Sequence, residues 1–236
     1  MKISKNFLLS VALKRGEGEA RGAYPFDLPA IRHLDALDFD QAVTFLVGEN
    51  GTGKSTLLEA IAVKWGFNAE GGSRNYRFAS RESHSELHAS LILARGVRKA
   101  DDGFFLRAES FYNVATEAER LGAHHGLHEQ SHGESFMTIL TERFFGNGLY
   151  LLDEPEAALS PSRQMSMLAR MHELVKEGSQ FVIATHSPIL MAYPGAVLLQ
   201  FSEDGIQQVR YEDTEHYQLT RRFLENPGRM LRELLD

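Results

Sequence analysis

The chain has 236 residues, of which 43% are hydrophobic and 24% are charged. These values are ordinary for globular proteins and suit a single α/β domain over residues 1–236. The formal net charge is −7, which gives no general electrostatic footprint for nucleic acid, and the lack of cysteine excludes disulfides. No stretch resembles a secretory signal peptide or a membrane-spanning helix, so we expect a cytoplasmic chain without membrane insertion.

The apolar pattern predicts strands that alternate with helices. The predicted strands are 7–13, 43–47, 89–93, 104–106, 149–152, 181–184, 197–201 and 206–211. Several are short and apolar without alternation, which is typical of strands buried on both faces of a mostly parallel sheet. Helices are predicted after Gly53 and over 134–145, 161–176 and 215–235, with Ser160 as the N-cap of the third. Two stretches are predicted to be loops or insertions: 15–29, read as a hairpin followed by an irregular crossing, and the polar stretch 70–84, placed on the surface.

A phosphate-binding loop is predicted directly after the strand 43–47. Residues 48–56 read Gly-Glu-Asn-Gly-Thr-Gly-Lys-Ser-Thr, which matches G-x-x-x-x-G-K-[ST] between a strand and a helix. Glycines let backbone N–H groups approach phosphate oxygens, and the positive end of the helix attracts them. Lys54 is predicted to bridge the β- and γ-phosphates and Ser55 to bind Mg²⁺. The predicted nucleotide-binding residues here are Gly48, Glu49, Asn50, Gly51, Thr52, Gly53, Lys54, Ser55 and Thr56.

Polar side chains follow two further apolar strands. Asp153 and Glu154 come directly after the strand 149–152, and His186 comes shortly after 181–184. Ligands of open α/β folds bind at the carboxyl ends of the strands, so these side chains should meet at one edge. Asp153 is predicted to hold Mg²⁺, usually through water, and Glu154 to polarise the attacking water. His186 could bond the γ-phosphate or that water.

These motifs, in this order, resemble those of the ABC ATPase superfamily. Residues 48–56 look like its Walker A motif, and 149–154 like its Walker B motif with the catalytic Glu. His186 looks like its switch histidine. Residues 130–135, Gln-Ser-His-Gly-Glu-Ser, resemble a variant of the signature motif, and 157–160 resemble the D-loop, with Ser160 where transporters usually carry Asp.

Residues 154–161 and 184–188 are closer still to a group of small bacterial ATPases. That group is usually described as predicted AAA-family ATPases, akin to the heads of SMC-type and overcoming-lysogenization-defect proteins. The resemblance implies a P-loop NTPase fold with an ABC-type head and a mostly parallel central sheet flanked by helices. It also implies an antiparallel β portion at the N-terminus and a small helical lobe, roughly 110–146, that carries the signature motif.

The resemblance further implies ATP and Mg²⁺ as ligands and a head-to-tail homodimer that forms on ATP binding. Ser131 and Gly133 of one subunit would contact the γ-phosphate held by the other. The chain then resembles a soluble motor or switch in DNA maintenance or defence, although the net charge does not support DNA as a partner. Two alternatives stay open: the ATP-binding subunit of a membrane transporter, and a slow nucleotide-gated module that recruits a protein partner.

Three features depart from the family pattern or stay ambiguous. There is no Gln between Leu57 and Glu129, so the Q-loop glutamine is not identifiable, and Glu109 is the nearest substitute. Tyr24 stands where an adenine-stacking aromatic is expected, but a loop or core tyrosine is an equal reading. A histidine cluster precedes and enters the signature, and a polar loop is favoured over a metal site there. Its members are His124, His125, His128 and His132.

Overall fold

A central six-stranded sheet organises the fold. The computed structural model describes residues 5–14, 23–69, 71–72, 85–107 and 132–235. The strands are β3 (Val43–Gly48), β5 (Asp102–Arg107), β6 (Gly148–Asp153), β7 (Gln180–Ala184), β8 (Val197–Ser202) and β9 (Gly205–Val209). Their order is β5-β6-β7-β3-β8-β9, and all neighbours are parallel except the hairpin β8–β9. The prediction of a mostly parallel central sheet is confirmed.

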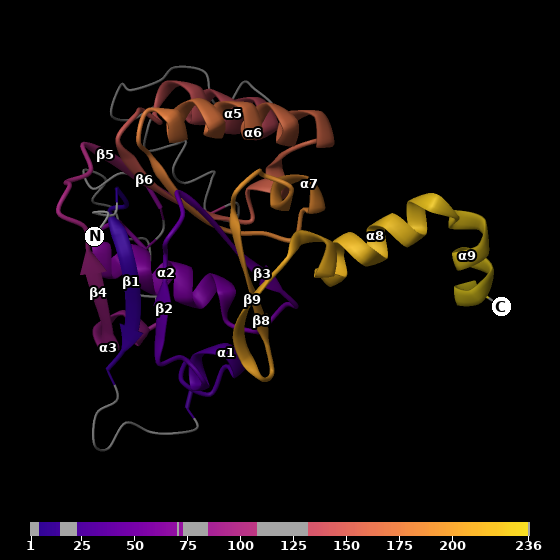
Figure 1. Ribbon diagram of the computed structural model, residues 1–236, viewed down its shortest axis with the longest axis horizontal. Coiled ribbons are helices and arrows are strands. Elements are labelled where there is room, and N and C mark those ends of the chain that lie inside the picture. The colour runs from indigo at the N-terminus through magenta and orange to yellow at the C-terminus, as the bar shows by residue number, and fades with distance from the viewer. Residues whose placement is uncertain (1–4, 15–22, 70, 73–84, 108–131, 236) are drawn as a thin grey trace.

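Helices cover both faces of this sheet (Figure 1). Helix α2 (Lys54–Trp65) packs on one face, and α5 (His132–Glu142) and α6 (Pro161–Lys176) pack on the other. Every residue of β3, β6 and β7 is buried. This explains why these strands are apolar without alternation, since each of their faces meets a hydrophobic core.

A second, antiparallel sheet lies on the outer side of α2 (Figure 1). It contains β1 (Leu8–Leu13), β2 (Ala36–Asp38) and β4 (Leu91–Arg95) in the order β2-β1-β4. The buried side chain of Gln180 joins the two sheets: its Oε1 accepts from the N–H groups of Phe7 and Leu8, each at 2.9 Å. Its Nε2 donates to the Leu8 carbonyl at 2.8 Å. The expected antiparallel β portion at the N-terminus is therefore present.

Apart from the helix predicted over 215–235, the longer predicted elements agree with the structure, and the shortest were missed. Helix α6 begins and ends as predicted, and the Ser160 hydroxyl accepts a hydrogen bond from the Arg163 N–H as its N-cap. The missed elements are β2, α1 (Pro29–Arg32), α3 (Leu87–Ser90), α7 (Pro188–Met191), and the 3₁₀ turns η2 (Pro155–Ala158) and η3 (Tyr211–Asp213). The predicted loop 70–84 and most of the predicted lobe lie outside the described residues.

The single helix predicted over 215–235 is wrong. The structure has two helices, α8 (Glu215–Glu225) and α9 (Pro227–Leu235), with Asn226 between them at φ −151° and ψ 69°. Pro227 causes the break, because proline disfavours the α conformation of the preceding residue and lacks an N–H for the helix ladder. Proline is well tolerated at the first position of the new helix.

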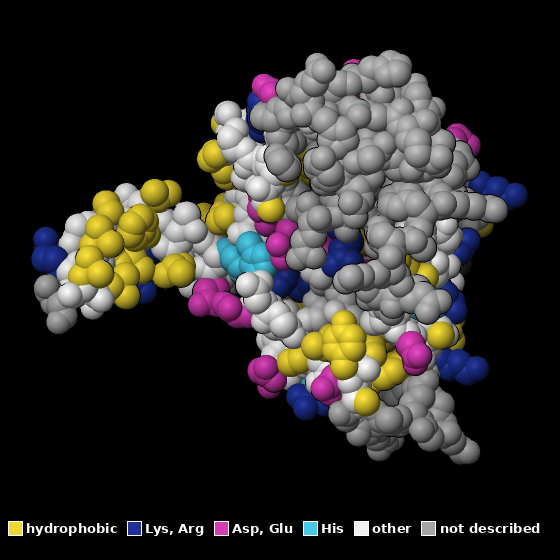
Figure 2. Space-filling view, turned by 180° about the vertical axis from the view of Figure 1, so that it is seen from behind, with side chains coloured by type: hydrophobic (Ala, Val, Ile, Leu, Met, Phe, Trp, Pro, Cys, Tyr) yellow, Lys and Arg dark blue, Asp and Glu magenta, His cyan; other side chains and the backbone are white. Residues whose placement is uncertain are grey.

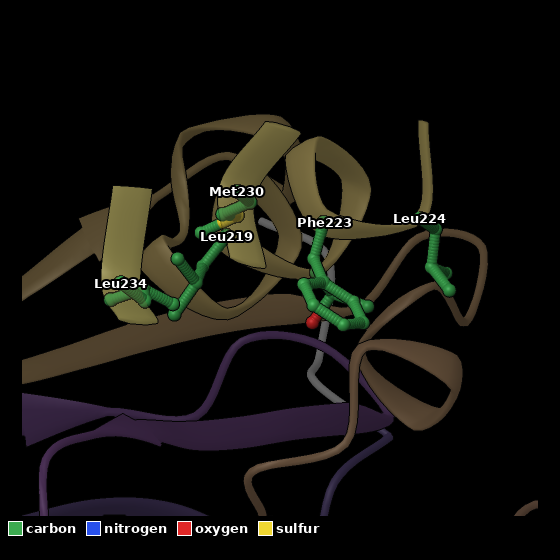
Figure 3. Close-up of a pocket in the computed structure, with 6 residues that line it drawn as sticks. Leu219, Phe223, Leu224, Met230 and Leu234 are labelled. Carbon is green, nitrogen blue, oxygen red and sulfur yellow. The ribbon is translucent and has the colours of Figure 1, made fainter. Parts of the chain in front are cut away.

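Helices α8 and α9 form an arm that extends away from the body (Figure 1). Apolar side chains on the arm are exposed, for example Leu224 at 71% and Leu235 at 80%. The arm also carries a surface groove of about 450 Å³ (Figure 3), lined by Leu219, Thr220, Phe223, Leu224, Met230 and Leu234. Among the helices of the described ranges, none is both long and apolar enough to span a membrane.

Candidate functional site

The predicted phosphate loop connects β3 to α2. Gly48 has φ +136°, and a Cβ there would collide with the Phe201 carbonyl oxygen on β8. Gly53 has φ +106° and stands immediately before α2. L-residues rarely adopt either conformation, so the two glycines give the loop its shape. The loop therefore presents its N–H groups at the positive end of a buried, twelve-residue helix.

Lys54 begins α2 and is only 4% exposed. Its Nζ donates to the carbonyl oxygens of Gly48 at 2.7 Å and Glu49 at 2.8 Å, which holds the ammonium group over the loop. Burial lowers the pKa of Lys54, and the carboxylates of Glu154 and Asp153 oppose that shift. The cation is thus surrounded by the loop and by the acids at the end of β6.

Ser55 and Asp153, both predicted to bind Mg²⁺, are brought together. The Ser55 hydroxyl donates to Asp153 Oδ1 at 2.8 Å, although 98 residues separate them. A hydroxyl and a carboxylate oxygen are the hard donors that Mg²⁺ prefers. Within the ranges that the structure describes, no group of three or more acidic or histidine side chains could hold a metal. This donor set fits Mg²⁺, which usually takes one or two protein ligands and completes its shell with water and phosphate.

Arg107 and Glu59 support this acid, although no sequence pattern indicates either of them. Arg107 ends β5 and lies opposite Asp153 in the parallel ladder. Its Nη1 donates to Glu59 Oε2 on α2 at 2.5 Å, and its Nε lies 3.5 Å from Asp153 Oδ2. The arginine therefore links the phosphate-loop helix to the carboxylate at the end of β6.

Glu154 follows in a conformation that non-glycine residues rarely adopt, with φ 51° and ψ 50°. Such strain is concentrated at functional sites, where it aims a side chain. Its N–H donates to the Ala184 carbonyl at 2.9 Å, so the acid lies beside the end of β7. Its Oε1 is 3.8 Å from His186 Nε2. The predicted base and the predicted switch histidine are therefore neighbours.

Glu156 anchors the backbone of His186. Its Oε1 accepts from the His186 N–H at 2.6 Å, and burial raises the pKa of this carboxyl group. Burial also lowers the pKa of His186, with a further contribution from Lys54. His186 Nδ1 is 2.9 Å from Nε2 of His216, the second residue of α8, which the sequence did not single out. Figure 2 shows histidine side chains beside acidic ones at the base of the arm.

Several predicted positions lie elsewhere or outside the described part of the chain. Ser131, Glu109 and three of the clustered histidines (His124, His125 and His128) are outside it. Gly133 is described in the first turn of α5, where an added Cβ would lie 2.8 Å from the Ala158 carbonyl oxygen and would also meet Arg163. Tyr24 is 65% exposed, which favours a loop tyrosine over a core tyrosine.

Known families match the two halves of this site. A family described as an AAA ATPase domain matches residues 135–191, and one described as an AAA domain matches 25–100. The first span holds Asp153, Glu154 and His186, and the second holds the whole phosphate loop. The chain has the motifs and the fold of an ABC-type P-loop ATPase.

Curated proteins similar to this chain include ATP-binding proteins of ABC transporters. An uncharacterized ABC transporter ATP-binding protein of Haemophilus influenzae is 23% identical over 75% of this chain and 77% of its own length. The cobalt import ATP-binding protein CbiO of Salmonella paratyphi A is 29% identical over 68% of this chain and 67% of its own.

Two solved structures share the fold. One is an inward-facing metal-chelate type ABC transporter described as putative, with TM-score 0.51 and 16% identity over 91% of this chain and 88% of that one. The other is cbiO1 of Clostridium perfringens, with TM-score 0.51 and 15% identity over 94% of this chain and 96% of that one. At these identities the likeness concerns the fold alone.

Proposed function

We propose that the chain binds ATP with Mg²⁺ and hydrolyses it. The observation that carries the proposal is the 2.8 Å hydrogen bond between Ser55 and Asp153, which brings the two halves of a metal–phosphate site together. Glu154 and His186, 3.8 Å apart, complete the same edge of the sheet. A phosphate loop, a metal-binding pair and a candidate base within one site are the parts that phosphoryl transfer requires.

Each side chain has one task in this proposal. Lys54 and the N–H groups of the loop bind the phosphates, and Ser55 and Asp153 hold Mg²⁺, which neutralises charge on the phosphate oxygens. Glu154 orients the attacking water and accepts its proton. His186 keeps its Nε2 towards Glu154, from where it can bond the γ-phosphate or the water.

Phosphate release tests the catalytic part of the proposal. We expect wild-type protein to release phosphate from ATP with Mg²⁺ and to stop when EDTA removes the metal. Glu154→Gln should lower the rate about 10²- to 10⁴-fold, the usual loss on removing a general base, while nucleotide binding persists. Nucleotide binding without Mg²⁺-dependent hydrolysis by the wild type would leave only a binding module.

We further propose a head-to-tail dimer on ATP binding, in which Ser131 and Gly133 of one copy complete the site of the other. Gly133 supports this as the first-turn glycine of α5, a helix whose positive end favours an anion. The expected result is a change from monomer to dimer mass for Glu154→Gln when ATP is added. A monomer at saturating ATP would contradict the dimer and leave the catalytic proposal standing.

The coupled process has three candidate readings. The names of similar proteins favour an ATP-binding subunit of a transporter, with a membrane partner supplied by another chain. A motor or switch in DNA maintenance or defence has no support from the net charge of −7. ATPase rates with and without DNA at low salt separate the two, because a DNA-dependent motor is stimulated and a transporter subunit is not. A slow turnover that DNA leaves unchanged would favour the nucleotide-gated module.

A further inference from the structure

The contact between His186 and His216 is part of the arm's attachment to the site. The two rings lie with centroids 5.1 Å apart and an interplanar angle of 55°, and Nδ1 of His186 is 2.9 Å from Nε2 of His216. A tilted pair with one nitrogen aimed at the other is the geometry of a hydrogen bond. Thirty residues separate the two histidines, and they come from the end of β7 and the start of α8.

Several contacts fix the position of His216. Thr214, immediately before α8, is fully buried and caps the helix by accepting from the Tyr217 N–H. Its hydroxyl donates to the Tyr211 carbonyl at 2.7 Å. The Tyr211 hydroxyl in turn donates to the Pro188 carbonyl at 2.9 Å, in the helix that follows His186. The first turn of α8 is therefore anchored to the segment that carries the switch histidine.

The surroundings select which nitrogen of each ring carries the proton. Burial lowers the pKa of both histidines, so each ring is neutral near pH 7 and carries one N–H. Glu154 Oε1 lies 3.8 Å from His186 Nε2, and a nearby carboxylate favours a proton on that nitrogen. His186 Nδ1 is then a bare acceptor. Among the residues that the structure describes, His216 Nε2–H is placed to donate to it, at 2.9 Å.

We propose that His216 is a positioning residue that holds His186 in the Nε2–H form, with that N–H directed to the side of Glu154. The inference rests on the proposed hydrolysis of ATP, in which His186 bonds the γ-phosphate or the water. It assigns to α8, and thus to the root of the arm, a direct hydrogen bond to the site. A histidine that rotates or changes tautomer would present a bare nitrogen where a donor is needed.

Substitutions at one position separate the hydrogen bond from packing. His216→Leu keeps a side chain of similar reach and removes the donor, whereas His216→Gln restores an N–H at nearly the position of Nε2. We expect His216→Leu to lower kcat about threefold to tenfold with little change in KM, the effect of losing one such hydrogen bond. His216→Gln should recover kcat to within about twofold. His172→Leu is the control, because the hydrogen-bond partner of His172 is Tyr193 and not His186.

Nitrogen-15 NMR of the imidazole rings reads the tautomer without nucleotide, with the His186 signals assigned by their loss in His186→Asn. We expect an unprotonated Nδ1 and a protonated Nε2 for His186 in the wild type and in His216→Gln. In His216→Leu the two forms should mix. An unchanged spectrum in His216→Leu, or an equal loss of kcat in the Leu and Gln variants, would overturn the inference. A wild type without ATPase activity would end the proposed function, and the NMR result would still decide the role of His216.

Discussion

At the carboxyl edge of the central sheet, polar side chains are buried and paired, whereas the arm of α8 and α9 leaves apolar side chains in the open. Lys54 and Asp153 are 4% and 6% exposed, yet each has polar partners. Leu224 and Leu235 are 71% and 80% exposed. A buried charge without partners is costly, so the edge depends on its geometry. The arm contacts this edge at its root, where His216 lies against His186.

The largest loss of stability should come from a substitution in the core next to the site. Leu152 is fully buried in β6, directly before Asp153, so Leu152→Ala removes buried apolar surface and leaves a cavity. We expect the free energy of unfolding to fall by about 2–5 kcal/mol. Urea denaturation with and without the substitution measures it. A loss below 1 kcal/mol would mean that this edge is far less tightly packed than the structure indicates.

Lys54→Ala removes a buried charge from the carboxyl edge of the sheet. The substitution removes the cation proposed to bind phosphate, together with its hydrogen bonds to the Glu49 and Gly48 carbonyls. A hydrogen bond to a charged group contributes about 1.5–3 kcal/mol, so we expect ATP affinity to fall about 10- to 150-fold. Titration calorimetry measures the affinity, with the exposed Lys176→Ala as the control. Equal affinity in the two variants would contradict the assigned role of Lys54.

Glu156→Gln tests a buried carboxyl group through pH. Burial raises its folded-state pKa above the ordinary 4.5, so ionisation of Glu156 favours unfolding. That cost is absent below pH 4.5 and complete above the folded-state pKa. Glutamine keeps an oxygen for the His186 N–H without ionising. Relative to wild type, the variant should therefore gain stability as pH rises from 4.5, and then level off.

Urea unfolding at several pH values measures this gain, and the exposed Glu203→Gln is the control. A difference that stays constant from acid to neutral pH would contradict burial as the cause of the Glu156 shift.

The smallest change in stability should come from a substitution at the tip of the arm. Leu235 is 80% exposed, so Leu235→Ala removes almost no buried surface. We expect the free energy of unfolding to change by no more than about 0.5 kcal/mol. A loss comparable to that of Leu152→Ala would mean that another surface covers the arm in solution, and a protein concentration series of the urea midpoint would reveal it.

The residues of the site that belong to local motifs were predictable from the sequence. The residues that reach the site through long-range contacts were not. The loop 48–56 is one unbroken run of residues, and so are the two acids at the end of β6. Each run can therefore be recognised as a motif from its own residue order. The contacts missed from the sequence join residues that are far apart in the chain. Arg107 and Glu59 lie 46 residues or more before Asp153, and His216 lies 30 residues after His186. The residues next to them in the sequence do not indicate these contacts.

The length of an element also decided whether it could be predicted from the sequence. Long apolar strands and the capped helix 161–176 were predicted, because many residues contribute to one pattern. The three-residue β2 and the four-residue α1, α3 and α7 offer too few residues for a period to emerge. The break at Asn226 is different, because Pro227 signalled it and the amphipathic pattern on both sides concealed it.

Mixing two inactive variants tests the central claim most directly, that a second copy completes each ATP site. Lys54→Ala disables the phosphate loop, and Ser131→Arg disables the signature position. Each variant alone should hydrolyse little ATP. In a head-to-tail dimer, mixing them creates heterodimers with one intact site, so an equal mixture should recover about a quarter of the wild-type rate. A mixture that forms heterodimers by mass and stays as inactive as its components would contradict the account.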